Sequence, residues 1–175
     1  MSSLKILFQN DLSPALDIAG NPLSYTEDTV ILINKLPVKI TVTWQDGFAC
    51  RISMEKLADK ETINPLTTTT SIFTRALKRF IDKQDHLLNI PIRFYTTSFR
   101  KRVYRAVMNI PTGQTKTYSD ISSVAGGSPR AVGQALNANP LPLAIPCHRV
   151  IGKSNKLVGF SCGLSIKAEL LSLEQ

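Results

Sequence analysis

The sequence has no long hydrophobic run and little cysteine or histidine, and these absences exclude several classes of protein. No apolar stretch approaches the roughly 20 residues that span a bilayer, and residues 1–5 do not begin a secretory signal. Three cysteines do not make a disulfide framework, and neither histidine has a cysteine at zinc-finger spacing. We therefore expect a cytoplasmic protein, or a nuclear one if the source is eukaryotic, with no membrane contact, metal or cofactor.

The composition is that of a folded, basic protein. Hydrophobic residues make up 43% of the 175 residues and charged residues 19%, which is enough for a buried core. Lysine and arginine number 21 against 13 aspartates and glutamates, so the formal charge is +8. Such a charge favours a polyanionic partner such as nucleic acid, although it also serves solubility alone.

The first half of the chain predicts a small α/β domain over residues 1–90. Runs of β-branched and aromatic residues predict strands at 4–8, 30–36, 38–44 and 48–52, with turns at Pro37 and at Asp46-Gly47. Apolar residues at helical spacing predict a helix over 71–83. We interpret the basic residues of this helix first as a solvated face, and only second as a contact with DNA. Residues 86–97 read as a connection between domains.

The second half predicts a mostly α-helical domain over residues 91–175. A helix capped by Thr97 or Ser98 ends at Pro111, and a short helix starts at Thr117. The pair Gly126-Gly127 breaks that helix, after which Ser128 and Pro129 suit the start of another. Two short helices joined by a glycine turn form a helix-turn-helix, a pattern shared with any αα-corner. Residues 166–173 read as a C-terminal helix with Lys167 on its polar side.

The second short helix is unusual for a helix that reads bases. Its exposed positions include Ala131 and Gly133, and long hydrogen-bonding side chains are few. Small residues allow the backbone to approach a groove wall closely, which favours contact that tolerates any sequence. Alternatively, they pack this helix against its own domain.

The run Pro146-Cys147-His148-Arg149-Val150 concentrates reactive chemistry in an apolar surrounding. A cysteine beside histidine and arginine can have a lowered pKa, although a lone cysteine in an apolar strand is more often inert core. A Cys-His pair also suggests a thiol hydrolase. Adjacent side chains on a strand point to opposite faces, so His148 would need a bend or a water to serve Cys147. His86 remains a conceivable remote base.

This run resembles the active-site signature of the O6-alkylguanine-DNA alkyltransferases. The resemblance extends from Thr97 to Glu174 with matching order and spacing. Its further motifs are Ile110-Pro111-Thr112-Gly113, Thr117-Tyr118, Ser128-Pro129-Arg130-Ala131-Val132-Gly133, Asn139-Pro140, Gly159-Phe160-Ser161, Gly163-Leu164, Lys167 and Leu170-Leu171. The first half is less diagnostic, but a small α/β domain there is what the resemblance implies.

The resemblance implies a role for each catalytic position. Cys147 is similar to the alkyl acceptor, His148 to the base that activates it through a water, and Glu174 to the group that polarises His148. Asn139 is similar to the residue that braces the turn before the active site. The carboxylate of Glu174 would be held against His148 by the C-terminal helix.

Other positions resemble the parts of the family that contact DNA and guanine. Tyr118 resembles the residue that meets the flipped base, and Arg130 the finger that enters the duplex. The guanine pocket is matched by Pro142, Val150, Phe160 and Ser161, and the helix that docks in the minor groove by Ser128, Ala131 and Gly133. Cys162 departs from the glycine of many relatives, and the interval between Tyr118 and Arg130 is two residues shorter than in some.

The resemblance implies direct-reversal repair by a monomer that acts on double-stranded DNA containing O6-alkylguanine. The reactive carbon lies on the pairing edge of the base, so the base must be flipped out before a thiolate attacks it. The thioether product has no leaving path, so one chain performs one turnover. The alternatives are a damage binder, which would lack the acceptor cysteine, a transcription factor, for which 175 residues leave little room, and a thiol hydrolase.

Overall fold

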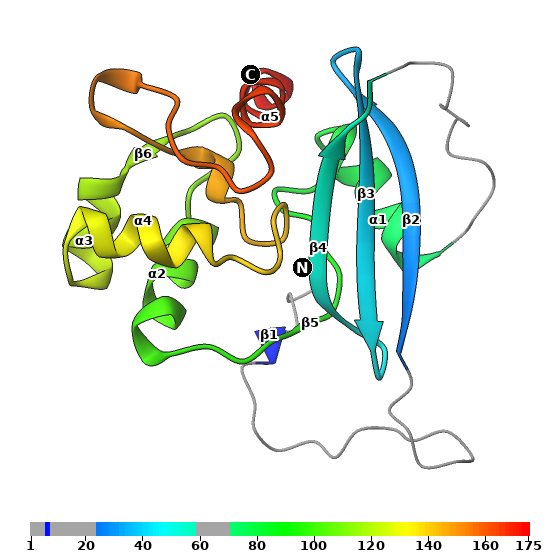
Figure 1. Cartoon of the computed structure of the whole chain (residues 1–175), viewed down its shortest axis with the longest axis horizontal. Coiled ribbons are helices and arrows are strands. Elements are labelled where there is room, and N and C mark those ends of the chain that lie inside the picture. Colours follow the sequence, from blue (N-terminus) through cyan, green and yellow to red (C-terminus); the bar gives the residue numbers. More distant parts are fainter. Residues whose placement is uncertain (1–5, 8–23, 59–70) are drawn as a thin grey trace.

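The computed structural model describes residues 6–7, 24–58 and 71–175, and in it a small sheet stands beside a group of helices (Figure 1). The sheet is built from β1 (Ile6–Leu7), β2 (Ser24–Ile33), β3 (Leu36–Gln45), β4 (Phe48–Lys56) and β5 (Ile92–Arg93). Its order is β1-β5-β4-β3-β2. The predicted α/β character of the first half is confirmed, and of the strand expected at 4–8 only Ile6–Leu7 lies in the described residues.

Two tight turns connect the three long antiparallel strands. Asp46 and Gly47 both have positive φ, 52° and 77°, as the predicted turn requires. The first turn was predicted at Pro37 but lies before it, at Asn34 and Lys35, whose φ angles are 49° and 82°. Pro37 therefore lies inside β3, where its carbonyl accepts from Leu57 N–H at 2.9 Å. Leu57 follows the end of β4, so the missing N–H of the proline interrupts no ladder.

The predicted helix of the first half is α1 (Ile72–Ile81), with Ser71 as its N-cap. Phe73, Leu77 and Phe80 are buried. In Figure 1, α1 lies by β2 and β3, on the side of the molecule away from α3 and α4. Its basic residues form exposed ion pairs, Lys78 with Asp82 and Arg79 with Asp85. The interpretation of these residues as a solvated face is confirmed.

The helices of the second half begin where the capping signals predict. α2 (Ser98–Met108) is capped by Thr97, α3 (Tyr118–Ala125) by Thr117 in a capping box with Asp120, and α4 (Pro129–Asn137) by Ser128. Gly126 and Gly127 join α3 to α4, both with positive φ. At Gly127 a Cβ would lie 2.9 Å from the ring of Phe99, so the turn also needs the missing side chain.

The remaining elements of the second half surround the cysteine run. β6 (Lys116–Thr117) pairs in parallel with β7 (Val150–Ile151), and α5 (Leu164–Glu174) ends the chain.

None of the helices in the described residues has the length and apolar character that a bilayer-spanning helix requires.

Several contacts join the sheet to the helical half. Ile52 N–H on β4 donates to the carbonyl of Pro140 at 2.8 Å, and the side chain of Asn34 donates to the carbonyl of Glu169 on α5 at 3.1 Å. β5 belongs to the sheet, pairing with β1 and β4, although it follows the boundary predicted at residues 90 and 91. One hydrophobic core runs through both halves.

Candidate active site

Cys147 lies in a 3₁₀ turn, Cys147–Arg149, and not in the strand that the apolar pattern suggested. The turn is closed by Arg149 N–H, which donates to the carbonyl of Pro146 at 3.0 Å. Pro146, which has no N–H to donate to a ladder, immediately precedes this turn. Regular pairing begins only at Val150. The bend that His148 needs in order to serve Cys147 is thus part of the backbone.

The Cys147 thiol is buried, with 4% of the residue exposed, and is held by Asn139. Asn139 Nδ2 donates to Cys147 Sγ at 3.1 Å and to the carbonyl of Ile145 at 2.9 Å, while its Oδ1 accepts from Leu141 N–H. Burial raises the pKa of Cys147 to about 11, against the smaller lowering by Asn139. A cysteine beside histidine and arginine can have a lowered pKa, but in the resting protein burial dominates and the pKa is raised.

His148 is fully buried and bonded to the last residue of α5. His148 Nε2 and Glu174 Oε1 are 2.8 Å apart. Burial raises the pKa of Glu174, but hydrogen bonds from His148 and Arg149 outweigh it and lower the pKa to about 2. The carboxylate can only accept, so Nε2 carries the proton. Burial lowers the pKa of His148, so the ring is neutral near pH 7 and its Nδ1 is the free basic atom.

His148 Nδ1 is buried, and no residue that the structure describes gives it a hydrogen bond. A bare basic nitrogen next in sequence to a thiol is suited to receive a proton, directly or through a water. His86, the alternative base, is engaged elsewhere. Its Nδ1 accepts from Thr112 N–H at 2.9 Å and is 2.8 Å from Thr112 Oγ1.

Arg149 connects Glu174 to the rest of the fold. It is fully buried, and its Nε and Nη2 donate to the Glu174 carboxylate at 2.8 to 3.1 Å. Nη1 donates to the carbonyl of Ile110 at 2.8 Å, and Nη2 to the carbonyl of His86 at 2.7 Å. The guanidinium is therefore directed to Glu174 and to two backbone segments.

Lys167 and Tyr118 converge on the backbone of the loop that precedes Phe160. Lys167 Nζ donates to the carbonyls of Val150 and Val158, each at 2.7 Å. Tyr118 Oη donates to the carbonyls of Val158 and Gly159 at 3.2 and 3.3 Å. Lys167 is fully buried, so placing it on a polar face of the last helix was wrong; burial lowers its pKa to about 8. Lys167 Nζ also donates to the carbonyl of Gly159 at 3.3 Å, and these three acceptors explain why a lysine is tolerated there.

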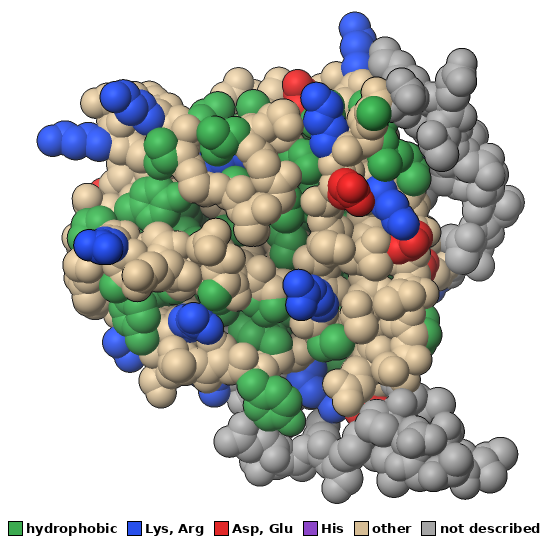
Figure 2. All heavy atoms as spheres, viewed as in Figure 1, with side chains coloured by type: hydrophobic (Ala, Val, Ile, Leu, Met, Phe, Trp, Pro, Cys, Tyr) green, Lys and Arg blue, Asp and Glu red, His purple; other side chains and the backbone are tan. Residues whose placement is uncertain are grey.

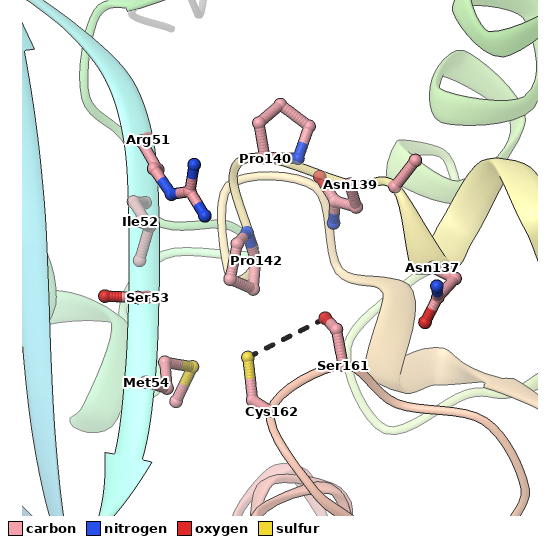
Figure 3. Close-up of a pocket in the computed structure, with 11 residues that line it drawn as sticks. Arg51, Ile52, Ser53, Met54, Asn137, Asn139, Pro140, Pro142, Ser161 and Cys162 are labelled. Atoms are coloured by element: carbon pink, nitrogen blue, oxygen red, sulfur yellow. Dashed lines mark hydrogen bonds between the residues drawn. The ribbon is translucent and has the colours of Figure 1, made fainter.

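A cavity of about 330 Å³ lies between β4 and the turns that flank the thiol (Figure 3). Of the residues predicted for the guanine pocket, Pro142 and Ser161 line it, together with Asn139. Val150 is buried under Lys167, and the ring of Phe160 stands edge-on to His148 with centroids 6.5 Å apart. The structure thus places all four predicted residues around one region, but only two on this cavity.

The residues predicted to contact DNA lie at the start of α4. Ser128 and Arg130 are exposed, and Ala131 and Gly133 are half-buried. A Cβ at Gly133 would lie 3.7 Å from the ring of Tyr118. The glycine therefore lets α4 pack closely against this tyrosine. Figure 2 shows Lys and Arg side chains spread over the face that carries α3 and α4, with very few acidic ones.

The described residues contain no group of three or more His, Cys, Asp or Glu side chains able to hold a metal ion. All three cysteines are free. The thiol is held by an amide and lies beside a neutral histidine that a carboxylate orients. This arrangement is typical of enzymes that use cysteine as a nucleophile.

Comparison with known proteins identifies the family. Residues 98–175 match the family model of the 6-O-methylguanine DNA methyltransferase, DNA binding domain. A methylated-DNA–protein-cysteine methyltransferase from Metallosphaera sedula is 42% identical over 125 residues, which are 71% of this chain and 76% of that protein. The chain belongs to the methylated-DNA–protein-cysteine methyltransferase family, and it is an enzyme of that kind.

Solved structures agree with this membership. The crystal structure of Mycobacterium tuberculosis O6-methylguanine methyltransferase superposes with a TM-score of 0.66 at 28% identity, over 86% of this chain and 93% of that one. The structure of Mycobacterium tuberculosis OGT in complex with DNA gives a TM-score of 0.65 at 30% identity, over 78% and 86%. The small sheet followed by helices is thus the fold of this family.

Three features of the site were not found from the sequence. The burial of Arg149 and Lys167 was missed because both are charged, and the only signal was that both lie in the matched motifs. The contribution of β4 to the cavity was missed because Arg51 to Met54 are about 90 residues from Pro142 in the chain and carry no motif.

Proposed function

We propose that this protein repairs DNA by direct reversal, moving an alkyl group from the O6 atom of guanine in duplex DNA to Cys147. The observation that carries the proposal is the bare Nδ1 of a neutral His148, oriented by Glu174 and adjacent to the Asn139-bound thiol. His148 takes the thiol proton through a water. The Sγ–C bond forms as the C–O6 bond breaks, and the bonding electrons leave with the guanine.

The departing guanine is negatively charged until it receives a proton or strong hydrogen bonds. Tyr118 is the donor we propose. Burial raises the pKa of its hydroxyl, so it carries its proton at neutral pH. In the resting protein the same hydroxyl donates to the carbonyls of Val158 and Gly159, at the loop that continues into Phe160 and Ser161. Substrate binding would exchange these acceptors for the guanine.

A buried thiol requires that the base leave the duplex. O6 faces the partner base in the stack, and only 4% of Cys147 is exposed, so the two atoms cannot meet while the base is paired. We propose that α3 and α4 form a helix-turn-helix that docks in the minor groove. Arg130, exposed at the start of α4, would fill the space left by the flipped nucleotide. Ala131 and Gly133 would let the helix approach the groove wall.

Each chain acts once under this mechanism. The product is a thioether, and breaking it would require a second nucleophile at the same carbon. The partner is double-stranded DNA, which the complex of the Mycobacterium tuberculosis relative with DNA and the matched DNA-binding domain support. We propose a monomer of two units, in which residues 1–90 are the scaffold and residues 91–175 carry the DNA-binding and acceptor groups. β5 belongs to the second unit by this boundary but pairs with the sheet of the first.

The intact mass of the protein tests this function. After incubation with a duplex containing O6-methylguanine, the mass should rise by one methyl group, and peptide mapping should find it on Cys147. The Cys147→Ser variant is the control, and its mass should not change. An unchanged mass of the parent protein would instead indicate a damage binder, a transcription factor or a thiol hydrolase.

A further inference from the structure

The cavity beside the active site is closed by the sheet of the first half. β4 contributes Arg51, Ile52 and Met54, and the opposite wall consists of the turns at Pro140–Pro142 and Ser161–Cys162 (Figure 3). The hydrogen bond from Ile52 N–H to the carbonyl of Pro140 fixes the strand against the first turn. The width of the cavity is therefore set by both halves of the protein.

The cavity adjoins the thiol. Asn139 lines it and also donates to Cys147 Sγ at 3.1 Å. Pro142 and Ser161, which match the guanine pocket, line it as well. An alkyl group whose first carbon touches Sγ would thus extend past Asn139 toward β4.

The walls of the cavity are mixed in character. Pro142, Met54 and Cys162 contribute apolar surface, and Asn139, Ser161 and Arg51 contribute polar groups. Arg51 projects from β4 toward the Pro140–Pro142 turn in Figure 3. The Arg51 side chain is exposed, and no residue that the structure describes accepts a hydrogen bond from its guanidinium. An exposed guanidinium at the edge of this cavity is suited to bind a carboxylate in two hydrogen bonds.

We infer that Arg51, at the edge of the cavity beside the acceptor cysteine, favours O6-alkyl groups that end in a carboxylate. The inference rests on the proposed function and names its substrate class. The bonds made and broken are those of methyl transfer, and the carboxylate takes no part in them. Arg51 acts on binding of the adduct and is not a catalytic residue.

Free guanine bases test the inference without DNA phosphates that could also bind Arg51. The probes are O6-alkylguanines of two to four carbons that end in a carboxylate, each matched with the primary amide of the same length. Transfer to Cys147 is followed by intact mass under single-turnover conditions. We expect the parent to react faster with the acid than with the amide at the best length, by about tenfold, the size of one charge-assisted pair at a partly exposed site.

Substitution separates Arg51 from the net charge of the protein. Arg51→Ala should remove the preference for the acid and leave the rate with the amide within twofold, while Arg51→Lys should keep part of it. Lys56→Ala is the matched control, because Lys56 is an exposed cation on the same strand that does not line the cavity. It should keep the full preference.

Two outcomes would overturn the inference. One is an equal acid-to-amide ratio in the parent at every length. The other is loss of repair in Arg51→Ala only on duplex substrates, which would make Arg51 a phosphate contact. Failure of the proposed function looks different, since the parent would then transfer no methyl group from O6-methylguanine in duplex DNA.

Discussion

Replacing Glu174 with glutamine should weaken the fold and the reaction together, and the structure gives the size of the first effect. The carboxylate accepts from His148 and from Arg149, both fully buried. Their hydrogen bonds bring its pKa from 4.5 to about 2 against the effect of burial. Such a shift corresponds to about 3 kcal/mol of stability by linkage. Breaking a buried pair costs about 3–5 kcal/mol, which agrees.

The pH dependence of this stability has a definite direction. The folded pKa lies below the unfolded one, so the stabilisation is fully present above about pH 4.5 and is lost as the pH falls toward 2. Urea unfolding at pH 7, 4.5 and 3 should show the parent losing this contribution at the lowest pH. The free energy of unfolding of Glu174→Gln should be lower than that of the parent at pH 7. It should also lack the part of the acid-induced decrease that comes from Glu174.

The rate should fall as well, for a separate reason. Without the carboxylate, the imidazolium that forms when Cys147 loses its proton is no longer stabilised. Single-turnover transfer, measured where both proteins are folded, should slow by about 10²-fold. Glu169→Gln is the matched control, because Glu169 lies on α5 and bonds Asn34 only through its backbone carbonyl. A rate within twofold of the parent, with an unchanged acid slope, would refute this reasoning.

Three further predictions address the thiol, the finger and the charge. Cys147→Ser should bind DNA but transfer nothing, because a hydroxyl is almost never ionised near neutral pH. Residual transfer by this variant within tenfold of the parent rate would exclude Cys147 as the acceptor. Cys50→Ser is the control and should stay active. Arg130→Ala should slow repair of duplex DNA far more than reaction with free O6-benzylguanine, whereas equal losses would make Arg130 structural. DNA affinity should fall steeply with salt, by about −0.9 in the logarithmic slope per phosphate contact, and a flat dependence would remove the electrostatic contribution.

Local signals in the sequence predicted the helices of the second half well. Thr117 and Ser128 cap helices because their hydroxyls accept from backbone N–H groups three residues later, an interaction that needs no distant partner. The same holds for the Asp46-Gly47 turn. The position of Pro37 inside β3 could not be predicted locally, because the effect of a proline depends on where the neighbouring strand ends.

The contact between His148 and Glu174 was predicted from the family motifs and is present in the structure, whereas the catalytic roles of the predicted residues stay predictions. The raised pKa of Cys147 was not predicted, because it depends on burial by segments far apart in the chain. Arg149 likewise looked like a partner of the thiol from its position in the sequence. Its actual partners, Glu174 and the carbonyls of Ile110 and His86, are 25 to 63 residues away.

The hydrogen bond between Ile52 and Pro140 has a consequence for solubility. β4 pairs with β5 only at Ala49 and Ile92, so most of this margin of the sheet would be a bare strand edge. Unpaired edges are templates for intermolecular strand addition. The turn at Pro140 caps part of this edge by accepting the hydrogen bond from Ile52 N–H. Any event that pushes the reactive turn outward would therefore expose a surface on which chains can aggregate.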